Sequence, residues 1–295
     1  MLVRVPASSA NLGPGFDALG MALTIYADVI VDSGGRDSAD DSLTSASADV
    51  QLLDERHPAT IAFRRAGGEG SVHLRSSIPV GRGMGFSGAV RVGGLVAAHA
   101  QRHGTDPAEL HRALPELLRV ATELEGHADN VAASLYGGVV ATAAGHAVQI
   151  PIALDPAMVL WVPSFATTTD ESRRKLPESV SLDDAVYNIG RTALLVAALT
   201  AGDVAALGAA TEDRVHQEVR LKNAQPSRVA LTAALDAGAW AAWLSGSGPS
   251  IAVMCAVDEA DAIAAALPAD GHCKVLRIDR AGAVIVAQDR DWDRG

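Results

Sequence analysis

The segment from Pro79 to Ala89, PVGRGMGFSGA, combines four glycines with a serine directly before an apolar helical pattern. Residues 71–75 before it alternate as a strand does, and residues 89–103 after it have the period of a helix that packs on a core. Glycines let backbone N–H groups approach a phosphate, and a helix start adds unpaired donors and a positive dipole end. The spacing therefore predicts a phosphate-binding loop for a nucleotide or a phosphorylated metabolite.

Other kinds of glycine loop fit this segment less well. Gly83, Gly85 and Gly88 satisfy GxGxxG, which is also common in ordinary strand–helix turns of a chain with 28 glycines. A dinucleotide fold is disfavoured because the loop starts only at residue 79 and the acidic residues about 20 positions on begin another helical stretch. A Walker loop is excluded because it needs Gly-Lys-Ser/Thr, and all three lysines lie in the second half of the chain.

The composition restricts the class of protein. With 48% hydrophobic and 20% charged residues, the 295-residue chain is expected to be globular, with one large or two modest domains. A net charge of −11 argues against nucleic acid as a partner, so an anionic substrate would need local arginines, which number 21 of the 24 basic residues. Two cysteines are too few for a metal cage. Without a signal peptide or a membrane-length apolar run, we expect a cytoplasmic protein with no membrane partner.

Hydrophobic periodicity divides the chain near residue 155. Strands are expected at 2–5, 22–31, 71–75, 139–152 with a turn at 144–146, 158–162, 240–244, 251–255 and 274–278. Helices are expected at 89–103, 107–124, 128–136, 182–207 with a break near 202–203, 226–237 and 258–267. Loops are expected at 8–17 and, in a low-complexity patch, at 33–49. The second half therefore predicts an α+β sandwich of helices on one antiparallel sheet.

Three further clusters of polar and small residues accompany the glycine loop. They are Asn11–Asp17 (NLGPGFD), Glu125–Asn130 (EGHADN) and Ser245–Ser250 (SGSGPS). In order and content the four clusters resemble motifs of the GHMP small-molecule kinases, and most closely those of the homoserine kinases. Further matching segments lie at 169–177, 184–188 and 216–220. The similarity covers nearly the whole chain, and this many motifs in one order are a specific signal.

The resemblance implies an α+β, GHMP-kinase-like two-domain fold. Residues 1–155 would form an ATP-binding domain like ribosomal protein S5, and residues 156–295 a ferredoxin-like α/β sandwich. The implied reaction is phosphorylation of the side-chain hydroxyl of L-homoserine by ATP, with Mg²⁺, to O-phospho-L-homoserine for threonine biosynthesis, by a homodimer. Two alternatives stay open: a GHMP kinase for another small alcohol, and a degenerate paralogue that binds nucleotide or amino acid without turnover.

Phosphoryl transfer needs charge neutralisation and in-line positioning more than a reactive side chain. Mg²⁺ takes few protein ligands, typically a carboxylate and a hydroxyl. Ser87 and Glu125 fit this need, and the resemblance implies the same pair, although a lone Glu125 would be interpreted as a solvated helix-end acid. The expected ATP-binding residues are Pro79, Gly81, Arg82, Gly83, Met84, Gly85, Phe86, Ser87, Gly88 and Ala89.

An amino-acid substrate offers an amino group, which favours carboxylate and amide oxygens, and a carboxylate, which favours guanidinium forks. The family's substrate-binding positions map onto Asn11, Asp17, His127, Asp129, Asn130, Arg173 and Arg220. On residue type alone, Asn11 and Asp17 could stabilise a turn, His127 could cap a helix, and Arg220 could be a surface residue.

The resemblance leaves two mechanisms, which differ in the role of Asp129. In mevalonate-type relatives an aspartate at this position is thought to accept the hydroxyl proton. In homoserine kinases it is thought to bind substrate while the proton goes to the γ-phosphate. We favour the second, with Asp129, Thr169 and Arg173 as the catalytic residues and Thr169 touching the transferring phosphate.

The phosphate loop departs from the family pattern GLGSSAA at two positions. Phe86 replaces a serine, and Gly88 loosens the helix start by up to about 1 kcal/mol relative to alanine. Residues 50–78, where the adenine pocket is expected, are shorter than usual, so no adenine contact is assigned.

Overall fold

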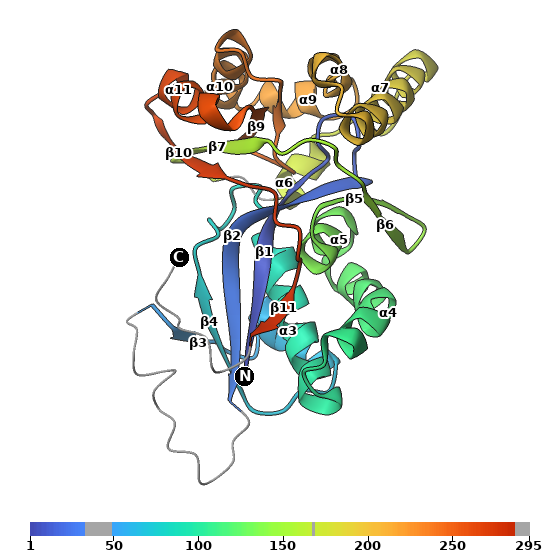
Figure 1. Ribbon diagram of the computed structural model, residues 1–295, viewed down its shortest axis with the longest axis vertical. Helices are drawn as coiled ribbons and strands as arrows, with labels where there is room; N and C mark the ends of the chain where they lie inside the picture. The colour runs from blue at the N-terminus through green and yellow to red at the C-terminus, as the bar shows by residue number, and fades with distance from the viewer. Residues whose placement is uncertain (33–48, 167–168, 287–295) are drawn as a thin grey trace.

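The computed structural model describes residues 1–32, 49–166 and 169–286 of the chain. Figure 1 shows two antiparallel sheets, the second lying above the first in this view. The surface loop predicted at 33–49 lies outside the described residues except for its last position.

Strand β2 (Leu19–Asp32) forms the centre of the first sheet. It pairs along its length with β1 (Leu2–Ala10), and its other edge pairs with β5 (Val139–Ala143) near its start and with β4 (Ser71–Ser76) near its end. The remaining strands of this sheet are β3 (Gln51–Leu52), β6 (His146–Ile150) and β11 (Val284–Val286). The start of β2 therefore lies between the end of β1 and strand β5.

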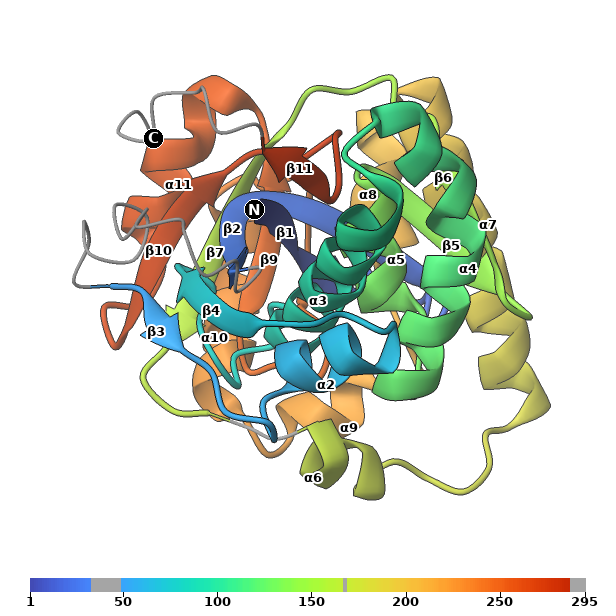
Figure 2. The same cartoon turned by 90° about the horizontal axis from the view of Figure 1, so that it is seen from below.

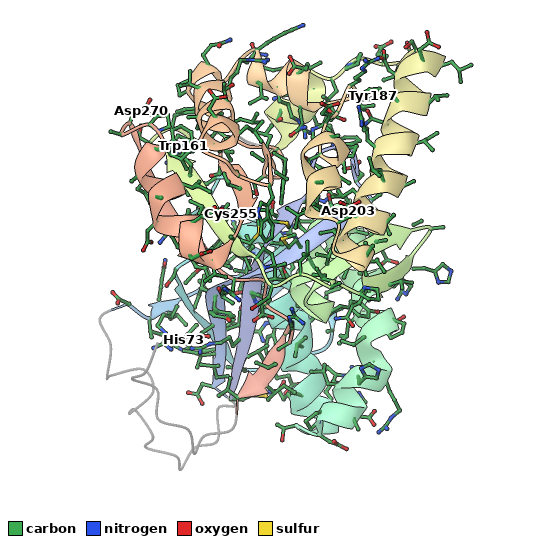
Figure 3. The ribbon with its side chains drawn as sticks, turned by 45° about the horizontal axis from the view of Figure 1, so that its top comes forward. His73, Trp161, Tyr187, Asp203, Cys255 and Asp270 are labelled. Carbon is green, nitrogen blue, oxygen red and sulfur yellow. The ribbon has the colours of Figure 1, made fainter. Side chains whose placement is uncertain are left out.

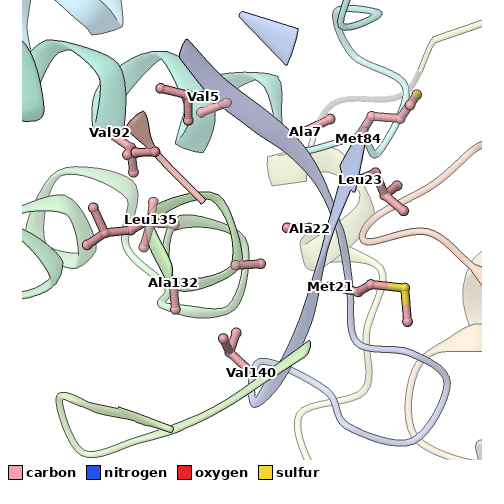
Figure 4. Packing of buried hydrophobic residues seen from close by; sticks show 14 of the residues in the cluster. Val5, Ala7, Met21, Ala22, Leu23, Met84, Val92, Ala132, Leu135 and Val140 are labelled. Atoms are coloured by element: carbon pink, nitrogen blue, oxygen red, sulfur yellow. The ribbon is translucent and has the colours of Figure 1, made fainter. Parts of the chain in front are cut away.

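Helices pack on the first sheet and on one another. They are α2 (Pro58–Arg65), α3 (Phe86–His103), α4 (Pro107–Glu125) and α5 (Asp129–Tyr136). Helices α3 and α5 contact β1 and β2 directly, and α2 and α4 pack against α3 (Figure 2). Val5 of β1, Val92 of α3 and Leu135 of α5 belong to the buried core between sheet and helices (Figure 4). This packing fixes the N-terminal end of α3 close to β1.

The second sheet has the strand order β10–β7–β9–β8. Its strands are β7 (Ala157–Pro163), β8 (Ala241–Leu244), β9 (Ile251–Cys255) and β10 (Gly271–Leu276). The helices of this half are α6 (Thr169–Arg174), α7 (Leu182–Ala201), α8 (Val204–Ala210), α9 (Gln217–Leu221), α10 (Gln225–Asp236) and α11 (Ala260–Ala266), with a 3₁₀ turn at Val257–Glu259.

Alternation along β7 shows that both faces of the second sheet are buried. Met158 and Leu160 join the core that includes the first sheet, whereas Val159 and Trp161 pack in a second core with α10 and α11. Trp161 and Cys255 lie on the neighbouring strands β7 and β9 in this second core (Figure 3). The two sheets therefore share one continuous apolar core.

The α+β class and the antiparallel second sheet are confirmed, as are most predicted elements. One correction concerns 8–17, which is a loop only from Asn11, because Ser8–Ala10 continue β1. Another concerns 274–278, where the strand runs instead from Gly271 to Leu276. Strand β11, near the end of the chain, pairs with β1 in the first sheet. The domain boundary at residue 155 stays a prediction.

Candidate active site

One cleft gathers the motif clusters that the sequence separates by more than 200 residues. The predicted residues that line it are Asn11, Asp17, Pro79, Gly81, Arg82, Gly83, Met84, Gly85, Phe86, Ser87, Glu125, His127, Asp129, Asn130, Arg173 and Arg220. Gly88 and Ala89 do not line it, and both are buried. Thr169 begins α6, and its side chain lies outside the described part of the structure.

The glycine loop is shaped by contacts with β1 and with the Ser245–Ser250 loop. Gly85, with φ +65°, immediately precedes α3, and a Cβ there would lie 2.0 Å from Ser8 Oγ. Ser245 Oγ donates to the carbonyl of Gly83 at 2.7 Å. The loop backbone therefore reaches the helix start by a path that only glycine permits at residue 85. Met84 lines the cleft but is buried in the core, and its predicted role in ATP binding stays untested.

Arg82 has carbonyl partners outside the loop. Its guanidinium donates to the carbonyl oxygens of Pro163 and Ser164 at 3.1 and 2.7 Å. Pro163 ends β7 and Ser164 follows it, so Arg82 ties the glycine loop to the second sheet. These contacts give Arg82 a role in positioning the loop. The predicted role of Arg82 in ATP binding stays untested.

The two departures of the loop from the family pattern have structural explanations. Phe86 packs against the core, and its ring meets the ring of His57 edge-on, with centroids 6.4 Å apart. A Cβ at Gly88 would lie 3.2 Å from Val131 Cγ1, so the glycine lets α5 approach α3 closely. Phe86 therefore extends the wall of the cleft, and Gly88 brings Asn130 close to the loop.

Ser87 and Glu125 meet as the sequence predicts. Ser87 Oγ, in the first turn of α3, donates to Glu125 Oε2, at the end of α4, at 2.9 Å. Burial raises the pKa of Glu125, while Arg91 and the hydrogen bond from Ser87 oppose that rise. The hydroxyl and the carboxylate suit Mg²⁺, and their separation is about that of neighbouring ligands in an octahedron with bonds of about 2.0–2.1 Å. Within the described residues no cluster of three His, Cys, Asp or Glu side chains could cage a metal.

Arg91 also contacts this pair, and the sequence reasoning missed it. Its Nη1 donates to Ser87 Oγ and lies 3.2 Å from Glu125 Oε2, and its Nε donates to the carbonyl of Leu124. Arg91 follows Ser87 by four residues on α3, which places both side chains on one helical face. That spacing was the available signal.

The start of α5 carries a connected polar group. His127 Nδ1 donates to Asp129 Oδ1 at 3.0 Å, and this hydrogen bond raises the pKa of His127. The backbone N–H of Asn130 donates to the same oxygen, and Ser8 Oγ donates to Asn130 Oδ1 at 2.8 Å. Asp129 is thus buried and oriented by two donors, with its position fixed against β1.

Two arginines also line the cleft. Arg173 forms a two-pronged ion pair with Asp17, at 2.8 and 2.7 Å. Arg220 is buried, and burial together with the charge of Arg173 lowers its pKa to about 10. Both guanidiniums lie over the ring of Phe16, 5.3 and 5.4 Å from its centroid. Arg220 Nε is buried without a hydrogen-bond partner in the described structure, so this part of the cleft suits an anion.

Arg220 is held by an unpredicted partner, His216. Arg220 Nη1 donates to His216 Nδ1 at 3.0 Å, and His216 Nε2 donates to the carbonyl of Gly13 at 2.8 Å. Because arginine only donates, His216 is neutral with its proton on Nε2. Asn11 Nδ2 and Arg220 Nη1 both donate to the carbonyl of Gly246. Helix α9 and two loops therefore converge through His216, Arg220 and Gly246. Asn11 also stabilises its own turn by accepting from Asp17 N–H.

The chemistry of the cleft follows from two groups of side chains that line it. The first is a helix start with a hydroxyl and a carboxylate, which suit a nucleotide's phosphates with a divalent cation. The second is two guanidiniums with a carboxylate, which suit a molecule carrying both an anionic and a cationic group. No helix in the described residues has the length and apolar character to cross a membrane.

Family models match both halves of the chain. The model of the GHMP kinases N terminal domain matches residues 50–138, and that of the GHMP kinases C terminal matches residues 195–273. Homoserine kinase of Streptomyces coelicolor is 41% identical over 298 residues, covering 96% of this chain and 94% of that protein. Homoserine kinase of Moorella thermoacetica is 39% identical, covering 86% of this chain and 87% of that protein.

Solved structures agree with the family models. The homoserine kinase from Cytophaga hutchinsonii has a TM-score of 0.80 at 25% identity, covering 97% of each chain. A putative homoserine kinase from Listeria monocytogenes has a TM-score of 0.72 at 28% identity, covering 97% of this chain and 99% of that one. A mevalonate kinase at 13% identity shares the fold, with a TM-score of 0.66. This chain belongs to the GHMP kinase family, with its two-domain fold, and within that family to the homoserine kinases.

Proposed function

We propose that the chain transfers the γ-phosphoryl group of ATP to the side-chain hydroxyl of L-homoserine, giving O-phospho-L-homoserine for threonine biosynthesis. The observation that carries this proposal is the convergence of the phosphate loop, the Ser87–Glu125 pair and the two arginines on one cleft. Relatives that share 36–41% of their residues with this chain over most of its length carry the name homoserine kinase.

The polar groups of the cleft define how homoserine would lie. Its carboxylate would form ion pairs with the guanidiniums of Arg173 and Arg220, and its amino group would form one with the carboxylate of Asp17. The zwitterion would thus replace the Asp17–Arg173 ion pair with new ion pairs to each of these residues. Asn11, His127 and Asn130 would complete the contacts around the amino and hydroxyl groups. In this arrangement the hydroxyl would point toward the glycine loop.

The start of α3 would bind the phosphates of ATP through backbone N–H groups of the glycine loop. Ser87 and Glu125 would hold Mg²⁺, which supplies charge neutralisation for the transferring phosphoryl group. Asp129 would orient the substrate hydroxyl, because its carboxylate already accepts from His127 and from Asn130 N–H. The hydroxyl proton would pass to the γ-phosphate, with Thr169 beside it.

The role of Asp129 has a kinetic test. As a substrate binder, Asp129→Asn should raise the KM for homoserine, since the amide loses the charge that attracts the amino and hydroxyl end. A variant that saturates normally and loses only kcat would identify Asp129 as the general base instead.

Two other functions are distinguished by one assay. A changed acceptor pocket would make this a GHMP kinase for another small alcohol, and Phe86 in the cleft wall favours a protein that binds without turnover. ADP release should be measured with homoserine, serine, mevalonate and galactose. We expect preference for homoserine; turnover of another alcohol would support the first alternative, and ATP binding without turnover the second.

We also propose that the protein is cytoplasmic and forms a homodimer. Helix α7 supports the second proposal, because Leu182, Val186 and Ile189 are exposed on one of its faces. With spacings of four and three residues, they form a stripe that a second copy could cover by two-fold symmetry.

A further inference from the structure

The positively charged guanidinium of Arg91 contacts Ser87 Oγ and Glu125 Oε2, the two oxygens that would bind the metal in the proposed function. Its Nη1 contacts Ser87 Oγ and lies 3.2 Å from Glu125 Oε2, the same Oε2 that accepts from Ser87. A divalent ion bound to these oxygens would have to share them with a positive guanidinium nitrogen. Because like charges repel, the guanidinium and the metal compete for one position.

The surroundings explain why a cation is kept there. Glu125 is 10% exposed and lies at the C-terminal end of α4, where the helix dipole is negative. The carbonyl of Leu124, in the same last turn, accepts from Arg91 Nε. A buried carboxylate at a helix C-terminus is costly without a counter-ion, and Arg91 supplies that charge from the protein itself.

We propose that Arg91 is a resident counter-ion of the metal site, which must leave Ser87 and Glu125 before a divalent cation binds them. The inference rests on the metal role proposed for Ser87 and Glu125 and adds a residue that governs affinity for the metal. Arg91 is 20% exposed, so its guanidinium has a path to solvent when it is displaced. Arg91 therefore weakens metal binding and keeps the metal-free pocket stable.

The test is a titration of the full chain with Mn²⁺, with free Mn²⁺ followed by electron paramagnetic resonance. Arg91→Gln removes the charge and should bind Mn²⁺ at least about tenfold more tightly than the unmodified protein. Arg91→Lys keeps the charge and should stay within about threefold of the unmodified protein. Arg102→Gln is the matched control, because it removes an arginine at the exposed end of the same helix.

Thermal unfolding gives a second readout, independent of turnover. Without its counter-ion, Arg91→Gln should have a lower Tm than the unmodified protein in EDTA and gain more Tm on addition of Mn²⁺. Mn²⁺ affinity for Arg91→Gln equal to or weaker than that of Arg102→Gln would overturn the inference. Glu125→Gln tests the metal role separately: if it leaves Mn²⁺ binding unchanged, the metal role proposed for Ser87 and Glu125 fails.

Discussion

At the residue scale, the cleft depends on arginines whose geometry lysine cannot copy. The guanidinium of Arg220 is buried over the ring of Phe16, and its Nη1 donates to His216 and to the carbonyl of Gly246. Its Nε has no hydrogen-bond partner among the described residues. Arg220→Lys should raise the KM for homoserine by roughly tenfold to a hundredfold and leave the KM for ATP nearly unchanged, because a point charge replaces a fork. Steady-state kinetics with each substrate varied would measure this.

Arg228→Lys is the control for that substitution, since Arg228 pairs with Glu218 on the surface. It should leave both KM values unchanged. An equal rise in the two KM values for Arg220→Lys would mean that the substitution disturbs the whole cleft, and would count against a specific role in carboxylate binding.

His216 makes the same part of the cleft sensitive to acid. It is fully buried, and burial lowers its pKa from the ordinary value of 6.5. A group whose pKa is lowered by folding contributes stability above its unfolded pKa and loses it as the pH falls through the folded value. The free energy of unfolding should therefore fall below about pH 6.5, where the unfolded state takes up the proton.

The matched variant is His216→Gln, because a glutamine side chain keeps one donor and one acceptor without titrating in this range. Urea unfolding between about pH 5 and 7.5 should show the unmodified protein losing stability relative to His216→Gln as the pH falls. Parallel pH profiles for the two proteins would refute the assignment of His216 as a neutral, buried link.

Residue types in the motifs predicted most of the cleft lining, including Ser87, Glu125 and Arg173. Arg91 was missed although it follows Ser87 by four residues on one helix, and Phe16 was missed because an apolar ring does not by itself indicate a ligand. Nor could residue types predict that Asp17 would pair with Arg173, a contact that joins positions 156 residues apart. Such pairs are set by tertiary packing, which local spacing does not contain.

At the scale of elements, strong periodicity predicted the long helices and the alternating strands. The helices α6 and α9 were missed because they have only six and five residues, too few for a hydrophobic period to show. Helix α2 was also missed. Strand β11 was missed because its three residues pair with β1 at the other end of the chain. The turn into α3 was predicted, because its glycines mark the backbone path.

That turn gives an element-scale prediction. Gly85→Ala would force a side chain into a left-handed backbone and onto Ser8 Oγ, and should lower the free energy of unfolding by about 2–4 kcal/mol. Gly104→Ala, just beyond the other end of α3, also has positive φ, but a Cβ there would meet no neighbouring group within 4 Å. It should cost about 1–3 kcal/mol from backbone strain alone, without a clash, and so less than Gly85→Ala. Urea unfolding of both variants measures the difference, and equal losses would mean that the contact with β1 is unimportant.

At the scale of the whole molecule, the two sheets share one core, and the cleft lies where loops from both converge. Met158 of the second sheet and Val5 of the first belong to the same buried cluster, so neither half can shift without changing the cleft. Function therefore depends on the halves folding together. The surface of α7 remains outside this core, along the upper edge of the molecule in Figure 1.

The homodimer proposal predicts that this α7 surface is covered in solution. Leu182 and Ile189 are 78% and 69% exposed, and a charge at each should cost more in a dimer interface than on a free surface. Sedimentation at micromolar concentration should give a dimer for the unmodified protein and a monomer for Leu182→Glu/Ile189→Glu. Val229→Glu, on exposed α10, should remain dimeric. A monomeric unmodified protein would refute the homodimer, and a dimeric double variant would place its interface elsewhere.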